Sequence, residues 1–127
     1  MKRQQSSGVM IQGRSSGQRR AHVRVPVCTP MRLTAEENGR VTQLTGHVLD
    51  VSITGCAARV YAVLEPDMVV RLAFEMDGEP MQIRGRIMWS KTKGGGRLIG
   101  IRFEGVRTQQ AVALQNYIAQ QQGRRLL

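Results

Sequence analysis

Three successive segments in the second half of the chain alternate apolar and polar residues with a period of two. Their apolar positions are Met68, Val70, Leu72, Phe74 and Met76, then Met81, Ile83, Ile87 and Trp89, then Ile99, Ile101 and Phe103. Successive side chains of a strand point to opposite faces of a sheet, so each segment predicts a strand with one buried face. The turn signal Asp77-Gly78 and a glycine-rich loop at 91–96 separate them. Such short connections favour an antiparallel sheet.

Three further strands are predicted upstream, at 27–34, 40–49 and 56–62, with a tight junction at Asp50 to Gly55. Pro26 directly precedes the first of them and Pro30 lies within it, which favours an edge strand because proline cannot donate to a ladder. Strands of this number and length tend to close into a small barrel. The period then changes, and the Ala- and Gln-rich segment 108–121 predicts one amphipathic helix that ends at Gly123. The expected fold is mainly β: a six-stranded antiparallel barrel with a C-terminal α-helix.

Charge is distributed unevenly along the 127 residues. Lys and Arg number 19 against 9 Asp and Glu, and residues 1–24 carry basic residues but no acidic one. Residues 1–18 are also rich in Gln, Ser and Gly, which predicts a flexible basic arm. We therefore expect an arm at 1–18, one domain at 19–122, a short tail at 123–127 and an anionic partner that meets the protein at the arm.

Several functional classes are disfavoured by what the sequence lacks. There is no apolar run of the ~18 residues that a membrane-spanning helix needs, and no secretory signal at the start. Cys28 and Cys56 have no CxxC spacing and lie among apolar residues, so free buried thiols in a cytosolic protein are expected rather than a disulfide or a metal pair. His22 and His47 are isolated, and no acid–base or metal-ligating pattern is present. We expect no enzyme activity, no cofactor and no metal.

Two short motifs carry the chemistry. Arg20 and Arg24 are four residues apart, and Asp50, Ser52 and Gly55 fall within six positions at a strand-to-turn junction. Guanidinium groups fork onto guanine O6 and N7 or onto phosphate, and a carboxylate accepts from the amino and imino protons of guanine. Each motif also has a simpler interpretation: solvated arginines on a basic tail, and a turn in which Asp and Ser bond nearby backbone while glycine supplies a positive φ.

The two motifs together, in this order, resemble the signature of PilZ domains, over roughly residues 19–122. The resemblance implies a bacterial, cytoplasmic receptor for cyclic di-GMP that regulates an unidentified effector protein, with motility or exopolysaccharide production as typical outputs. It implies ligand contacts from Arg20, Arg24, Asp50 and Ser52, with Gly55 keeping the surface open. Arg19, directly before the first motif, implies two intercalated ligand molecules per chain. Cys56 departs from the pattern, since many members have a second glycine there.

Two rival functions follow from other features. A barrel that binds nucleic acid non-specifically would explain the net charge of +10. It is disfavoured because Phe74, Phe103 and Trp89 are predicted to lie in the core, where they cannot stack on bases. A PilZ-like module that binds only protein is disfavoured by the intact motifs.

Overall fold

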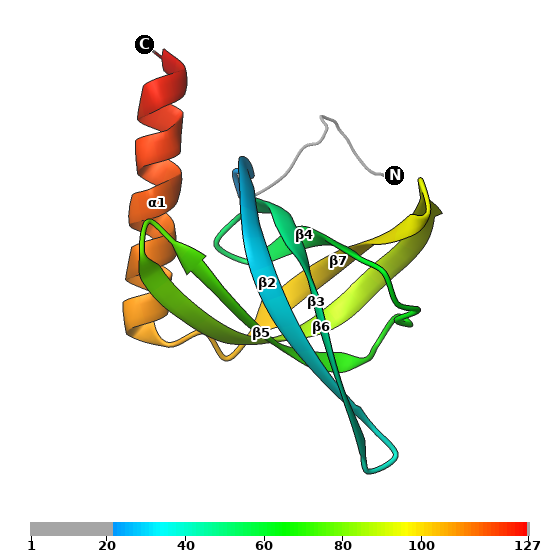
Figure 1. Ribbon diagram of the computed structural model, residues 1–127. Coiled ribbons are helices and arrows are strands. Elements are labelled where there is room, and N and C mark those ends of the chain that lie inside the picture. Colours follow the sequence, from blue (N-terminus) through cyan, green and yellow to red (C-terminus); the bar gives the residue numbers. More distant parts are fainter. Residues whose placement is uncertain (1–21, 127) are drawn as a thin grey trace, which may run out of the picture.

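The computed structural model describes residues 22–126 and forms a closed antiparallel barrel with one helix beside it (Figure 1). The elements are β2 (Val25–Glu37), β3 (Arg40–Val51), β4 (Gly55–Val60), β5 (Val69–Met76), β6 (Glu79–Lys93), β7 (Gly96–Glu104) and α1 (Thr108–Leu126). Around the barrel the strands follow the order β2-β3-β4-β7-β6-β5. The predicted six-stranded barrel with a C-terminal helix is confirmed. The arm predicted at 1–18, and Arg19 and Arg20, lie outside the described residues.

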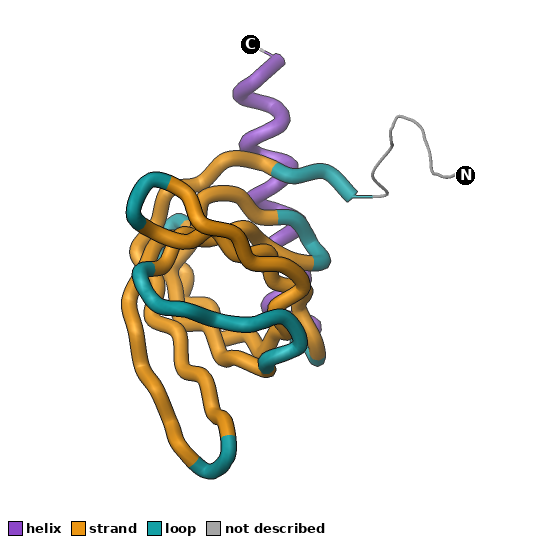
Figure 2. The backbone as a smooth tube through the Cα atoms, turned by 90° about the vertical axis from the view of Figure 1, so that its right-hand side faces the viewer, coloured by secondary structure: helices purple, strands orange, loops and turns teal. Residues whose placement is uncertain are grey.

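The core lies inside the barrel, which Figure 2 shows as a ring of strands with α1 alongside. Inward-facing residues of the alternating pattern fill it, and Leu33, Leu72, Ile87 and Ile99 are among the largest fully buried side chains. Leu114 and Ile118 of α1 belong to the same apolar cluster. The helix therefore buries one stripe against the barrel, while its C-terminal part extends past the strands (Figure 1).

The first strand is not an edge strand, contrary to the prediction from its prolines. β2 pairs with β3 along most of its length and with β5 over Met31–Ala35. Pro26 and Pro30 precede the stretch that pairs with β5, so neither has to donate to a second neighbour. Because the barrel is closed, β2 has a neighbour on each side. Its two prolines lie in the part that pairs with β3 alone.

Two predicted boundaries are also wrong. The expected loop at 91–96 is a two-residue turn, because β6 continues to Lys93 and β7 begins at Gly96. Gly94 and Gly95 have φ values of 56° and 82°, a left-handed conformation that suits a tight hairpin turn. At the end of the chain, α1 continues through Gly123, which therefore does not end the helix.

Burial corrects two further expectations. The β6–β7 register shifts between Ile87 and Trp89, so Trp89 leaves the inward-facing set and its side chain is 40% exposed. An irregularity of this kind, a β-bulge, changes the face on which the following residues lie. Cys28 is exposed, whereas Cys56 is buried as predicted, and both are free.

Candidate functional site

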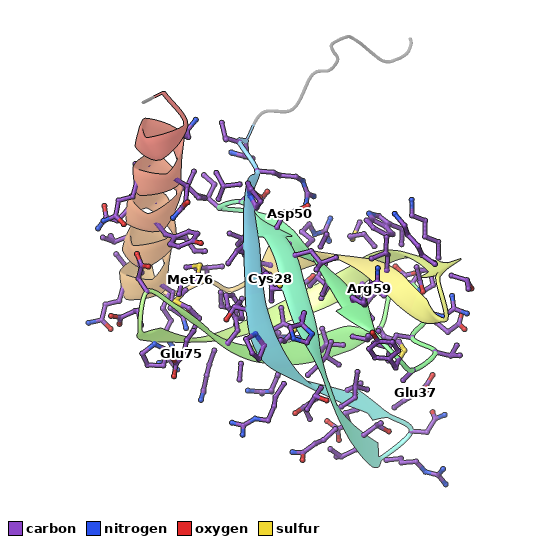
Figure 3. The ribbon with its side chains drawn as sticks, turned by 45° about the horizontal axis from the view of Figure 1, so that its top comes forward. Cys28, Glu37, Asp50, Arg59, Glu75 and Met76 are labelled. Atoms are coloured by element: carbon purple, nitrogen blue, oxygen red, sulfur yellow. The ribbon has the colours of Figure 1, made fainter. Side chains whose placement is uncertain are left out.

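The two motifs meet where the chain enters the barrel. Arg24 directly precedes β2, and Asp50 lies near the end of β3, opposite Pro26 in the register. Arg24 Nη1 donates to Asp50 Oδ1 at 2.6 Å, with side chains 31% and 35% exposed. Figure 3 shows Asp50 at this end of the barrel, close to the start of β2. Residues far apart in sequence thus form a half-exposed ion pair on the protein surface.

A β-bulge in β3 turns Asp50 outward. Val48 and Val51 are both fully buried although they are three residues apart, which a regular strand does not allow. The β3–β4 register accordingly shifts between Val48 and Asp50. The extra residue places Asp50 opposite Ala57, outside the barrel and within reach of Arg24.

Ser52 shapes the turn that follows. Its hydroxyl accepts from the backbone nitrogens of Thr54 and Gly55, both at 3.2 Å, and its own backbone N–H donates to the Gly55 carbonyl at 2.8 Å. The residue is 2% exposed, a rare degree of burial for serine. The structure therefore directs this hydroxyl into the turn, as the simpler interpretation of the motif holds.

Gly55 is required for a close approach of strands and not for a positive φ. Among the described residues, five glycines have a positive φ, and Gly55 is not one of them. The interpretation that Gly55 supplies a positive φ to a turn is therefore wrong. A Cβ at Gly55 would lie 2.3 Å from the backbone oxygen of Ile101 on β7. Thr54 adds to this contact by accepting from the backbone N–H of Phe103 at 2.8 Å. These two contacts hold the turn between β3 and β4 against β7.

Cys56 lies beneath the ion pair. Burial, together with the negative charge of Asp50, raises the pKa of its thiol to about 12, although the positive charge of Arg24 acts in the opposite direction. The thiol is therefore neutral at physiological pH and cannot serve as a nucleophile.

The fold also brings residues to this surface that the sequence did not reveal. Asp50, Ala57, Gly100 and Trp89 are successive neighbours across β3, β4, β7 and β6. The methyl group of Ala57 leaves a flat floor beside Asp50, and the exposed indole lies next to this floor over Gly100, where its Nε1 would be 2.1 Å from a Cβ. Only the bulge before Trp89 puts the indole here, and no sequence signal marks that bulge.

Arginines border this floor on the side of Gly55. Arg102 lies opposite Gly55 on one side and Arg86 on the other. Glu104 accepts from Arg86 Nε at 2.9 Å, and Arg102 Nη2 lies 3.7 Å from the same carboxylate oxygen. The hydrogen bond from Arg86 lowers the pKa of Glu104, and the surrounding arginine charges add to that effect. One carboxylate thus faces several guanidinium groups, which leaves the surface beside the floor positive.

The described residues offer neither a metal site nor a membrane-spanning helix. No group of three or more His, Cys, Asp or Glu residues among residues 22–126 is arranged to hold a metal ion. Within that range, α1 lacks the long apolar stretch that a helix needs to cross a membrane.

A protein-family model matches most of the chain. A model described as PilZ domain matches residues 18–120. An uncharacterized protein of Aquifex aeolicus is 28% identical over 106 residues, which cover 83% of this chain and 50% of that protein. The chain therefore spans about half the length of this curated relative.

Solved structures share the fold. The Bacillus subtilis inhibitor of motility MotI superposes with a TM-score of 0.71 at 17% identity, covering 85% of this chain and 54% of that protein. The PilZ domain of Escherichia coli YcgR, solved with cyclic di-GMP, gives 0.69 at 16% identity, covering 84% of this chain and 94% of that domain. At such low identity these similarities establish the barrel and its helix, and nothing about ligands.

Proposed function

The chain belongs to the PilZ domain family, and from this premise we propose that it is a receptor for cyclic di-GMP. The observation that carries the proposal is the 2.6 Å contact between Arg24 and Asp50, one residue from each motif, on the outer surface of the barrel. Structures of YcgR from E. coli and MrkH from K. pneumoniae, both similar in fold, were solved with this ligand. Their ligand supports the choice of dinucleotide for this chain.

The ion pair supplies the two kinds of group that a guanine nucleotide needs. The Arg24 guanidinium can donate to O6 and N7 of a guanine or to phosphate oxygens, and the Asp50 carboxylate can accept from the opposite edge of a base. Because each group is the other's partner, the ligand has to replace their mutual contact with its own. Ser52 and Gly55 hold the turn and the strand spacing that place Asp50.

The floor beside the ion pair suits a flat base. Ala57 leaves room above the sheet beside Asp50, and the indole of Trp89, which lies over Gly100, is 40% exposed at the far side. A purine held by Asp50 can extend across this floor, where the indole offers a π-face for stacking. Arg102 borders the same surface and provides positive charge for a phosphate.

Arg19 and Arg20 complete the proposal, although they lie outside the described residues. We assign Arg20 to the first ligand together with Arg24. Two stacked cyclic di-GMP molecules bring about four negative charges to one site, and Arg19 offsets part of that repulsion. We therefore propose two ligands per chain, falling to one in Arg19→Leu.

The proposed output is regulation of an effector protein. Exchanging the Arg24–Asp50 contact for contacts with the ligand would hold the segment that enters β2 against the dinucleotide and change the surface that the barrel presents. A cytoplasmic adaptor of this kind needs no catalytic group, and an effector that recognises only the liganded surface would respond to the dinucleotide.

Calorimetric titration of the purified chain tests the proposal. Cyclic di-GMP should bind saturably with micromolar or tighter affinity, while GTP and cyclic di-AMP serve as controls because one lacks the cyclic backbone and the other the guanine O6. Trp89 is the single tryptophan of the chain, so its fluorescence should change during the same titration. Absence of saturable binding by cyclic di-GMP, or equal binding of all three nucleotides, would overturn the proposal.

A further inference from the structure

Two aromatic rings lie on glycines of the same strand, on the same outer face. The indole of Trp89 covers Gly100 of β7, and the ring of Tyr61 lies against Gly96, whose Cβ position is 3.0 Å from Tyr61 Cε1. Gly96 and Gly100 are four residues apart, which places the two rings about 13 Å apart along the strand. Both side chains are accessible, Tyr61 at 70% and Trp89 at 40% exposure.

Basic residues flank the strand between these rings. Leu98 of β7 lies opposite Arg59 of β4 and Lys91 of β6, and Lys93 lies opposite Gly96. Arg59 Nη1 donates to the Lys93 carbonyl at 3.3 Å, which links the turn end of the β6–β7 hairpin to β4. Figure 3 shows Arg59 on the side of the barrel from which this hairpin extends.

No acidic residue interrupts this surface. Residues 55–60, 88–93 and 96–103 contain arginine and lysine but neither Asp nor Glu. Lys91 Nζ lies 5.5 Å from the centroid of the Trp89 ring, so positive charge is held close to an exposed aromatic face. We define the outer face made by Arg59, Tyr61, Trp89, Lys91, Lys93 and Leu98 as the β7 strip.

We propose that the β7 strip is a binding surface for single-stranded nucleic acid. Sequence-tolerant recognition of single strands combines aromatic rings on which bases stack with basic groups that follow the phosphates, commonly on the face of a β-sheet. An acidic protein segment would use the lysines and arginines but would leave the two exposed rings without a matching group. Exposed aromatic rings set between cations therefore favour nucleic acid over an acidic protein.

The rival function that the sequence disfavoured is thus restored by the structure at one specific surface. It was disfavoured because Phe74, Phe103 and Trp89 were expected in the core. The two phenylalanines are buried there, but the bulge in β6 places Trp89 outside. Tyr61 and Lys93 lie at the hairpin end of β7, whereas Arg24 and Asp50 lie beside the opposite part of β4 and β7. The inference therefore does not depend on the dinucleotide site, although the two surfaces share Trp89.

Fluorescence anisotropy tests the proposal by measuring how tightly the full chain binds fluorescein-labelled oligothymidylate and oligouridylate of about twelve nucleotides. Tyr61→Leu should weaken binding about 5- to 150-fold, the range that corresponds to loss of one stacked base, while Tyr61→Phe should retain parental affinity. Lys91→Gln combined with Lys93→Gln should reduce the slope of log K against log salt by about 1.4, because each lost phosphate contact contributes ~0.7 for single strands.

A matched control separates the strip from general attraction to a basic chain. Arg32 and Arg71 are exposed on β2 and β5, strands that do not adjoin β7, so Arg32→Gln combined with Arg71→Gln removes the same charge from another face. This control should bind the oligonucleotides as the parent does, within about twofold. Equal weakening by both double variants, unchanged affinity in the strip variants, or no binding by the parent would each overturn the proposal. Thermal melts of every variant check that the fold is retained.

Discussion

The ion pair between Arg24 and Asp50 gives the sharpest prediction, because one contact is expected to govern stability and binding in different ways. The perturbation is a double-mutant cycle of Arg24→Ala, Asp50→Ala and the double variant. The pair is short, at 2.6 Å, but its side chains are 31% and 35% exposed. Pairs of this kind contribute about 0.2–1 kcal/mol to the free energy of unfolding, since water screens the charges. Each single variant should therefore lower Tm by no more than about 8 °C.

Binding should be affected far more. Each single variant loses one charge-assisted contact with cyclic di-GMP, which costs about 1.5–3 kcal/mol, or about 10- to 150-fold in affinity. The parent must also break its ion pair to bind, whereas neither single variant has a pair to break. The double variant should therefore lose more than the sum of the singles, by the pair energy of about 0.2–1 kcal/mol, or up to about fivefold.

Calorimetry gives the affinities, and thermal melts give the stabilities. Arg32→Ala is the matched control, because Arg32 is an exposed arginine of β2 away from the ion pair and should leave the affinity unchanged. Parental affinity in both single variants would refute the proposed site. A double variant whose loss equals the sum of the singles would refute the step in which the ligand breaks the ion pair, while leaving the site in place.

Four further predictions concern the same region. Gly55→Ala should destabilise the fold by about 1–3 kcal/mol, because its Cβ would lie 2.3 Å from the backbone oxygen of Ile101, and an unchanged Tm would contradict the close approach. Iodoacetamide at pH 8 should label the exposed Cys28 and spare the buried Cys56 until the chain is unfolded, as mass spectrometry can show. Burial raises the pKa of Cys56 from 9.0 to about 12, so its contribution to stability should be complete below pH 9 and lost as pH rises toward 12, and Cys56→Ala should remove that part of the pH dependence of unfolding. Saturating cyclic di-GMP should increase amide-exchange protection at residues 22–26, and unchanged protection there would exclude ordering of this segment by the ligand.

The sequence alone determined the class of fold, because the period of its apolar residues is set by strand and helix geometry. Alternation from Met68 to Phe103 predicts strands with one buried face, and the change of period near Thr108 predicts the helix. It also supplied the two motifs and the family resemblance, which the match to the PilZ domain model confirmed. These features are local, so neighbouring residues suffice to reveal them.

Only the tertiary structure decided which of these residues face one another. Register shifts beside Asp50 and Trp89 moved each to the outer surface, and a shift of one residue reverses the face of a strand without changing its composition. The close approach of β4 and β7 explains Gly55, although its own neighbours suggested a turn. Cys28 is exposed although its neighbours are apolar, because it lies on the face of β2 opposite the buried Val25 and Met31. Pairing across the barrel depends on residues distant in sequence, and for that reason the geometry of the site could not be derived from the motifs alone.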